Sequence, residues 1–159
     1  MPPPAQPLAV QPATLMKLEG IAFAPPASPW RLMNGSDGLS RTFQLESANQ
    51  TATLTVTSLI SSWREKDDKR CSGKLKDREH KHITRLARLG NGESARGLDG
   101  CDWGDTTDKS GTRWTRSATV FDRELEAGYW FYVEGDVALQ ADGNAALQKL
   151  LDSIEVLYR

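Results

Sequence analysis

The residues best suited by type and spacing to do chemistry are four aspartates that recur at every third position: Asp99, Asp102, Asp105 and Asp108. Carboxylates in a glycine-containing loop offer the oxygen ligands that calcium prefers. Their spacing differs from the alternating aspartates of an EF-hand loop, and aspartate is also a common turn residue. We therefore interpret the four as an acidic, turn-rich segment that contacts a partner protein, with calcium binding as the alternative.

A second candidate is the pair His80 and His82, which would share one side of an extended segment. Zinc sites normally use three or four protein ligands, so the pair is a weak metal candidate, and we expect two exposed histidines. No serine has the context of a nucleophile elbow, and no glycine-rich loop carries the Lys-Ser/Thr of a phosphate-binding loop. We therefore expect no enzyme activity and no cofactor.

The segment 64–81 is the most charged part of the chain, with eight basic and five acidic residues and almost no apolar ones. Such a composition predicts a solvated segment outside the core. It contains no tyrosine or phenylalanine for base stacking, and the chain's net charge is −1, so nucleic acid is not an expected partner. We expect a charge-complementary protein interface here. The candidate residues are Arg64, Lys66, Lys69 and Arg70.

The only two cysteines, Cys71 and Cys101, stand too far apart for a CxxC redox or zinc motif. We predict a disulfide, which would stabilise the fold by about 3–4 kcal/mol on the chain-entropy model. The alternative is a pair of reduced thiols in a cytosolic protein. A disulfide favours the periplasm, for a protein that is either free or lipid-anchored at the outer membrane.

All eight prolines fall within the first thirty residues. Residues 1–16 are predicted to be a disordered proline-rich leader, because proline interrupts both helices and sheet ladders. Residues 17–159 have the length of a single domain and enough aromatic residues for a core. No run approaches the roughly 18 apolar residues of a membrane span.

The strongest structural pattern is 51–60, where apolar residues alternate with threonines, as in a strand with one buried face. Shorter strands are expected at 18–23, as an edge strand, and at 40–46. A further strand is expected to begin at 83, and another lies at 95–103. Strands at 112–121 and 128–133 are predicted to be antiparallel neighbours, after a turn at 105–111.

The end of the chain is predicted to be a helix that begins at Asp142, followed by a short strand. Its apolar residues, at i, i+3, i+4 and i+7, are Leu147, Leu150, Leu151 and Ile154. Several strands followed by a C-terminal helix predict an α+β fold.

Three segments carry a resemblance: 23–30, 51–60 and 145–156. Their order resembles the PsbP-like fold, which includes a photosystem accessory subunit, a nuclear import factor, bacterial DcrB-like lipoproteins and secretion-effector chaperones. The resemblance implies a curved antiparallel β-sheet packed with one to three helices. It also implies a protein-binding role without a catalytic centre, although the charged segment departs from the pattern.

These features together predict an exported, non-catalytic module that binds another protein. An immunity or inhibitor protein is favoured over an effector chaperone or an envelope assembly component. The alternative is a periplasmic protein that binds a small ligand or a metal through the histidine pair or the acidic segment.

Overall fold

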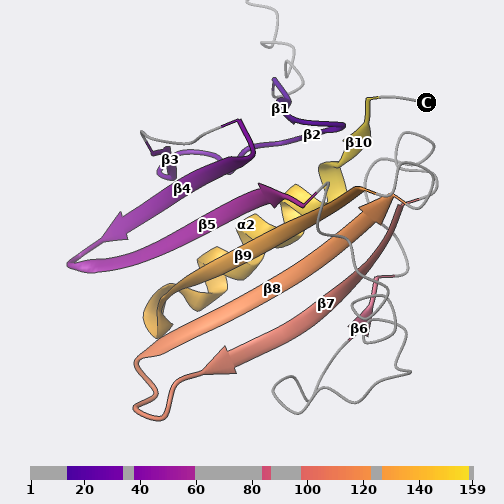
Figure 1. Ribbon diagram of the computed structural model, residues 1–159. Helices are drawn as coiled ribbons and strands as arrows, with labels where there is room; N and C mark the ends of the chain where they lie inside the picture. Colours follow the sequence, from indigo (N-terminus) through magenta and orange to yellow (C-terminus); the bar gives the residue numbers. More distant parts are fainter. Residues whose placement is uncertain (1–13, 34–37, 60–83, 87–97, 123–126, 158–159) are drawn as a thin grey trace, which may run out of the picture.

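The computed structural model describes residues 14–33, 38–59, 84–86, 98–122 and 127–157. These residues form two antiparallel sheets and one α-helix, so the predicted α+β class is confirmed (Figure 1). The larger sheet has the strand order β3-β4-β5-β9-β8-β7-β6, and the smaller one has the order β1-β2-β10. The strands are β1 (Met16–Leu18), β2 (Ile21–Phe23), β3 (Arg31–Leu32), β4 (Ser40–Ser47), β5 (Gln50–Ser58), β6 (Thr84–Arg85), β7 (Leu98–Thr107), β8 (Arg113–Asp122), β9 (Ala127–Asp136) and β10 (Glu155–Val156).

Strand β5 lies inside the larger sheet, between β4 and β9. Ala52, Leu54 and Val56 are buried, whereas the threonines between them are only partly buried. This alternation confirms the predicted strand with one buried face. Ile60, which was expected to extend the same buried face, lies outside the described residues.

Strands β8 and β9 pair along ten residues, in the register that matches Trp114 with Gly135 and Val120 with Tyr129. The prediction that they are antiparallel neighbours is confirmed. The predicted turn at 105–111 begins too early, because β7 continues to Thr107. A β-bulge between Asp102 and Gly104, where Gly104 has a φ of 82°, shifts the β7–β8 register and lets pairing continue past it.

Helix α2 (Gln140–Ser153) packs on one face of the larger sheet, behind the strands in the view of Figure 1. It begins two residues before the predicted Asp142 and follows a 3₁₀ turn, η2 (Val137–Leu139). The predicted apolar stripe is confirmed, because Leu147, Leu150 and Leu151 are all buried in the main core. No helix in the described part of the chain is long and apolar enough to span a membrane.

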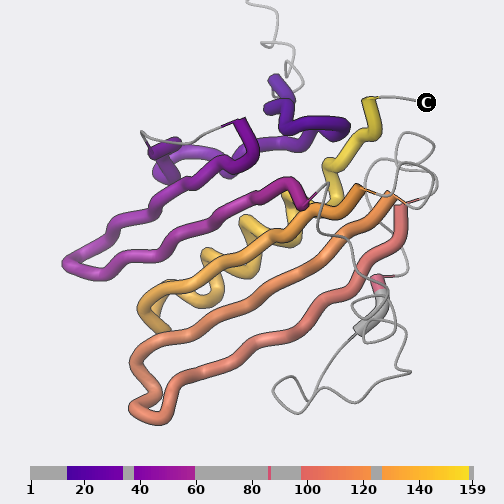
Figure 2. The backbone as a smooth tube through the Cα atoms, in the orientation of Figure 1, coloured from indigo at the N-terminus to yellow at the C-terminus, as the bar shows by residue number. Residues whose placement is uncertain are grey.

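The smaller sheet joins segments from opposite ends of the chain (Figure 2). The expected edge strand at 18–23 is instead a hairpin, β1–β2, which turns at Glu19 with a φ of 50°. The other edge of β2 pairs with β10, so Ala22 lies opposite Glu155. Met16, the last residue of the predicted leader, pairs with Phe23 in this hairpin; residues 1–13 lie outside the described residues.

Cys101 is fully buried with Phe121 in a small second cluster, against which Trp103 packs. It is disulfide-bonded. Its predicted partner, Cys71, lies outside the described residues, so the identity of the pair stays a prediction.

Replacing Leu54 by alanine is expected to lower the free energy of unfolding by about 2–5 kcal/mol, because the side chain is fully buried and its loss leaves a cavity. Thr55→Ala is the matched control and should cost less than about 1 kcal/mol. Urea unfolding of the two variants measures both effects. Equal losses would contradict the one-sided burial of β5.

Protein made in an oxidising compartment is expected to show no free thiol after denaturation, because Cys71 and Cys101 are predicted to pair. Reduction should then destabilise the fold by about 3–4 kcal/mol, since the closed loop spans thirty residues. Thiol titration in denaturant, with reduced protein as the control, measures this. Two reactive thiols in the oxidised sample would refute the pairing.

Candidate functional site

The four predicted aspartates form no common acidic rim. Asp102 accepts hydrogen bonds from Arg116, with Nη2 2.6 Å from Oδ2 and Nε 3.3 Å from Oδ1. Asp105 accepts a 2.9 Å bond from the Nδ2 of Asn144 on α2. Asp99 accepts a bond from the backbone N–H of the following residue. Asp102 and Asp105, which are predicted to contact a partner, therefore also connect β7 to β8 and to α2.

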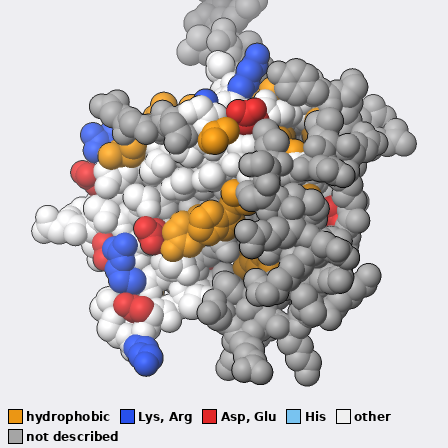
Figure 3. Space-filling view, viewed as in Figure 1, with side chains coloured by type: hydrophobic (Ala, Val, Ile, Leu, Met, Phe, Trp, Pro, Cys, Tyr) orange, Lys and Arg blue, Asp and Glu red, His pale blue; other side chains and the backbone are white. Residues whose placement is uncertain are grey.

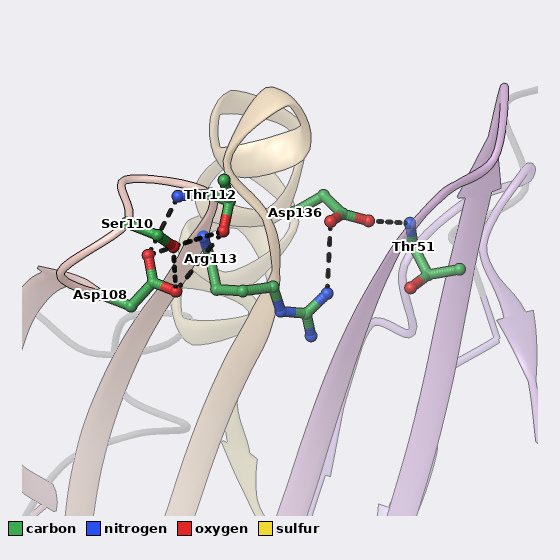
Figure 4. A network of polar contacts seen from close by, with 6 residues as sticks. All are labelled: Thr51, Asp108, Ser110, Thr112, Arg113 and Asp136. Carbon is green, nitrogen blue, oxygen red and sulfur yellow. Dashed lines mark hydrogen bonds and ion pairs between the residues drawn. The ribbon is translucent and has the colours of Figure 1, made fainter.

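Asp108 organises the β7–β8 turn and belongs to a network that reaches across the sheet (Figure 4). Its Oδ1 accepts the backbone N–H groups of Thr112 and Arg113. The bond from Arg113 is the main reason that the pKa of Asp108 lies below its ordinary value of 3.8. The Arg113 side chain pairs at 3.4 Å with Asp136, which also accepts the backbone N–H of Thr51 at 2.7 Å.

The other predicted site residues cannot be placed. Arg64, Lys66, Lys69, Arg70, His80 and His82 lie outside the described residues. Among the residues that the structure does describe, no group of three or more histidine, cysteine, aspartate or glutamate side chains could hold a metal.

The face of the larger sheet opposite α2, here called the outer face, carries a different set of side chains. The cross-strand register aligns them in columns across four adjacent strands. The columns are Thr42 and Gln44 of β4; Thr53, Thr55 and Thr57 of β5; Trp130, Tyr132 and Glu134 of β9; and Thr115, Ser117 and Thr119 of β8. Hydroxyl groups thus border the aromatic column of β9 on both sides.

Trp130 and Tyr132 form an aromatic pair on the outer face. Their ring centroids are 5.0 Å apart, with the planes tilted by 37°. Trp130 is 40% exposed, which is unusual for so large an aromatic side chain. Figure 3 shows hydrophobic side chains gathered over β9, with acidic and basic side chains at one end of this group.

Glu134 completes the column, because its Oε2 accepts a 3.0 Å hydrogen bond from the Tyr132 hydroxyl. Burial raises the pKa of Tyr132 above its ordinary value of 10.0, and the hydrogen bond and negative charge of Glu134 raise it further. Arg113 acts in the opposite direction. The two aromatic rings and the carboxylate, here called the Trp130–Tyr132–Glu134 cluster, form the candidate site.

A second tryptophan lies on the same face at the β-bulge of β7. The indole Nε1 of Trp103 donates a 2.7 Å hydrogen bond to the Oγ1 of Thr119, which is paired with Trp130 across β8 and β9. This bond orients Trp103, and its acceptor is the Thr119 hydroxyl beside the aromatic pair.

The sequence carries a signal for this cluster. Tyr129, Phe131 and Val133 recur at every second position of β9, and all three are buried. Strict alternation then places Trp130 and Tyr132 on the opposite face. Trp130 and Tyr132 are therefore out of phase with the buried residues of the same strand.

The comparisons with known proteins add no assignment to this geometry. No protein-family model matches the sequence, and no curated protein matches it either.

Glu134→Gln is expected to lower the pKa of Tyr132, because the substitution removes the negative charge that opposes ionisation of the phenol. Titration of the tyrosine ring signals by NMR at high pH measures the change. Glu46→Gln, at an exposed carboxylate of β4, is the control and should leave that pKa unchanged. An unchanged pKa in Glu134→Gln would mean that the two side chains are not hydrogen-bonded.

Proposed function

We propose that this domain is a non-catalytic, exported protein-binding module, and that the outer face of its larger sheet is the binding surface. The observation that carries the proposal is the exposed Trp130, which forms a tilted aromatic pair with Tyr132 between threonine- and serine-bearing strands. Tryptophan and tyrosine are the residue types most enriched at the energetic centres of protein interfaces.

The surroundings of the aromatic pair support the same role. Aromatic anchors supply contact area at a small entropic cost, and short hydroxyl side chains supply adaptable hydrogen bonds around them. The outer face has this composition, with threonine and serine on both sides of Trp130 and Tyr132. The strands beneath are held in register by long ladders, so the surface is preorganised for binding.

The biological class that fits is an immunity or inhibitor protein, or an effector chaperone, located in the periplasm. The resemblance to the PsbP-like fold favours this class, since its members mostly bind other proteins. The predicted disulfide favours an oxidising compartment. We place the proposed interface on the outer face rather than on the acidic segment, because Asp102 and Asp105 already bond to Arg116 and Asn144.

A second candidate function is the binding of a small ligand, favoured by a cavity of about 320 Å³ on the side of α2. Its walls include Pro26, Pro29, Trp30 and Asp142. A volume of this size is at the lower end of the range for small-molecule sites.

Trp130→Ala is expected to weaken binding of the native partner by at least about tenfold, because truncating a central aromatic residue commonly costs 2 kcal/mol or more. The partner would be captured from the native host with the wild-type domain, identified by mass spectrometry and titrated as a purified protein. Leu32→Ala is the control, since Leu32 is comparably exposed but lies at the edge strand β3.

The comparison of these variants decides between the two candidate functions. A partner whose affinity falls only with Trp130→Ala supports the proposal. A protein that binds both variants equally, or a small molecule retained in the cavity without any protein partner, would overturn it.

A further inference from the structure

We propose that the Trp130–Tyr132–Glu134 cluster is a subsite for a cationic side chain of the partner, with arginine as the best fit. This inference rests on the proposed function and names the chemistry that the outer face recognises. The guanidinium group would lie over the aromatic pair and bond to the carboxylate of Glu134.

The aromatic part of the subsite provides the first attraction. A cation over the face of a tryptophan or tyrosine ring is stabilised by the negative potential of the ring. Trp130 and Tyr132 are close enough, at 5.0 Å between centroids, for one planar group to contact both rings. Their 37° tilt opens an angle between the rings in place of a closed stack.

The carboxylate provides the second attraction. Among the described residues, Glu134 forms no ion pair, and its one hydrogen bond is the bond from the Tyr132 hydroxyl. An ionised carboxylate can accept about four hydrogen bonds, so most of its capacity is open. A guanidinium group can use that capacity through two parallel N–H donors.

The nearest described cation is already engaged. Arg113 lies close enough to influence Tyr132, but its guanidinium pairs with Asp136 at 3.4 Å. The other oxygen of Asp136 accepts the backbone N–H of Thr51. Arg113 and Asp136 therefore balance each other, which leaves the charge of Glu134 available to a ligand.

Trp130 is exposed, and Tyr132 and Glu134 are partly buried, between short side chains of the neighbouring strands. The residues beside Glu134 in the register are Thr53 and Thr115, and those beside Tyr132 are Thr55 and Ser117. All four are short and uncharged, so none of them contributes a competing cation or reaches over the rings.

The test uses two small probes that differ in charge but have nearly the same shape: Nα-acetyl-arginine amide and its neutral analogue Nα-acetyl-citrulline amide. Binding to the whole ¹⁵N-labelled domain is followed by NMR at the Trp130 indole N–H, assigned with Trp130→Phe. The arginine probe is expected to shift this signal saturably, and the citrulline probe to bind at least about fivefold more weakly.

Glu134→Gln should lower the affinity of the domain for the arginine probe by about tenfold and leave the fold unchanged. The control Glu46→Gln removes a carboxylate that already pairs with Arg31, and it should have no effect. Equal binding of the two probes, or arginine binding unaffected by Glu134→Gln, would overturn the inference. Binding of the arginine probe that appears only after Arg64, Lys66, Lys69 and Arg70 are replaced by glutamine would also overturn the inference. The natural occupant of the subsite would then be a side chain of this protein and not of a partner.

The same variants separate this inference from the proposed function. If a captured partner depends on Trp130 but binds Glu134→Gln as tightly as wild type, the cation subsite is wrong and the protein-binding function stands. If the arginine probe binds as expected but no protein partner depends on Trp130, the proposed function fails instead.

Discussion

The close approach of α2 to the larger sheet depends on one glycine. A Cβ atom at Gly143 would come within 2.7 Å of Cζ2 in the indole of Trp114, and its next neighbour, Val133, is only 3.1 Å away. Trp114 is fully buried, so its ring has little room to move aside. Polar contacts at the edge of the sheet fix the helix in the same position, since Asn144 bonds to Asp105, and Arg116 bonds to both Asp102 and Gln148.

Helix α2 covers one face of the larger sheet, which explains why most side chains on the outer face are polar. Every second residue of β5, β8 and β9 points to the helix and is mostly apolar, and most of the intervening residues are polar; Phe121 of β8, buried with Cys101, is an exception. On β5 those positions are all threonine, which suits an extended backbone and remains hydrated. Against this background, Trp130 of β9 is distinguished by its exposure, since 40% of this large aromatic residue is accessible to solvent.

The elements that could be predicted from the sequence are those whose pattern is local. The alternation in 51–60 and the helical spacing of Leu147, Leu150 and Leu151 each depend on a buried face that repeats within a few residues. The misassigned elements depend on pairing with other strands. The β1–β2 hairpin is stabilised by β10, and β7 continues past an Asp- and Gly-rich stretch because β8 pairs with it beyond the bulge.

The candidate site shows the same division. The aspartates looked available because their partners, Arg116 and Asn144, are 14 and 39 residues away from the carboxylates they bind. The aromatic pair could have been predicted from the alternation of Tyr129, Phe131 and Val133, because the residues between them must point to the opposite face. The neighbours of the pair on β5 and β8 could not be predicted, because they depend on the register of the whole sheet. The same holds for the surrounding hydroxyl groups and for the free capacity of the Glu134 carboxylate.

The position of β2 between β1 and β10 has a consequence for biosynthesis. Ile21, Ala22 and Phe23 are all buried in the finished domain, yet β10, which covers one edge of their strand, is translated more than 130 residues later. Contacts this distant in sequence form late, because a long loop must close first. Until β10 has been synthesised, the edge of β2 that it covers therefore has no partner from this sheet, and exposed apolar segments of this kind are typical substrates of chaperones.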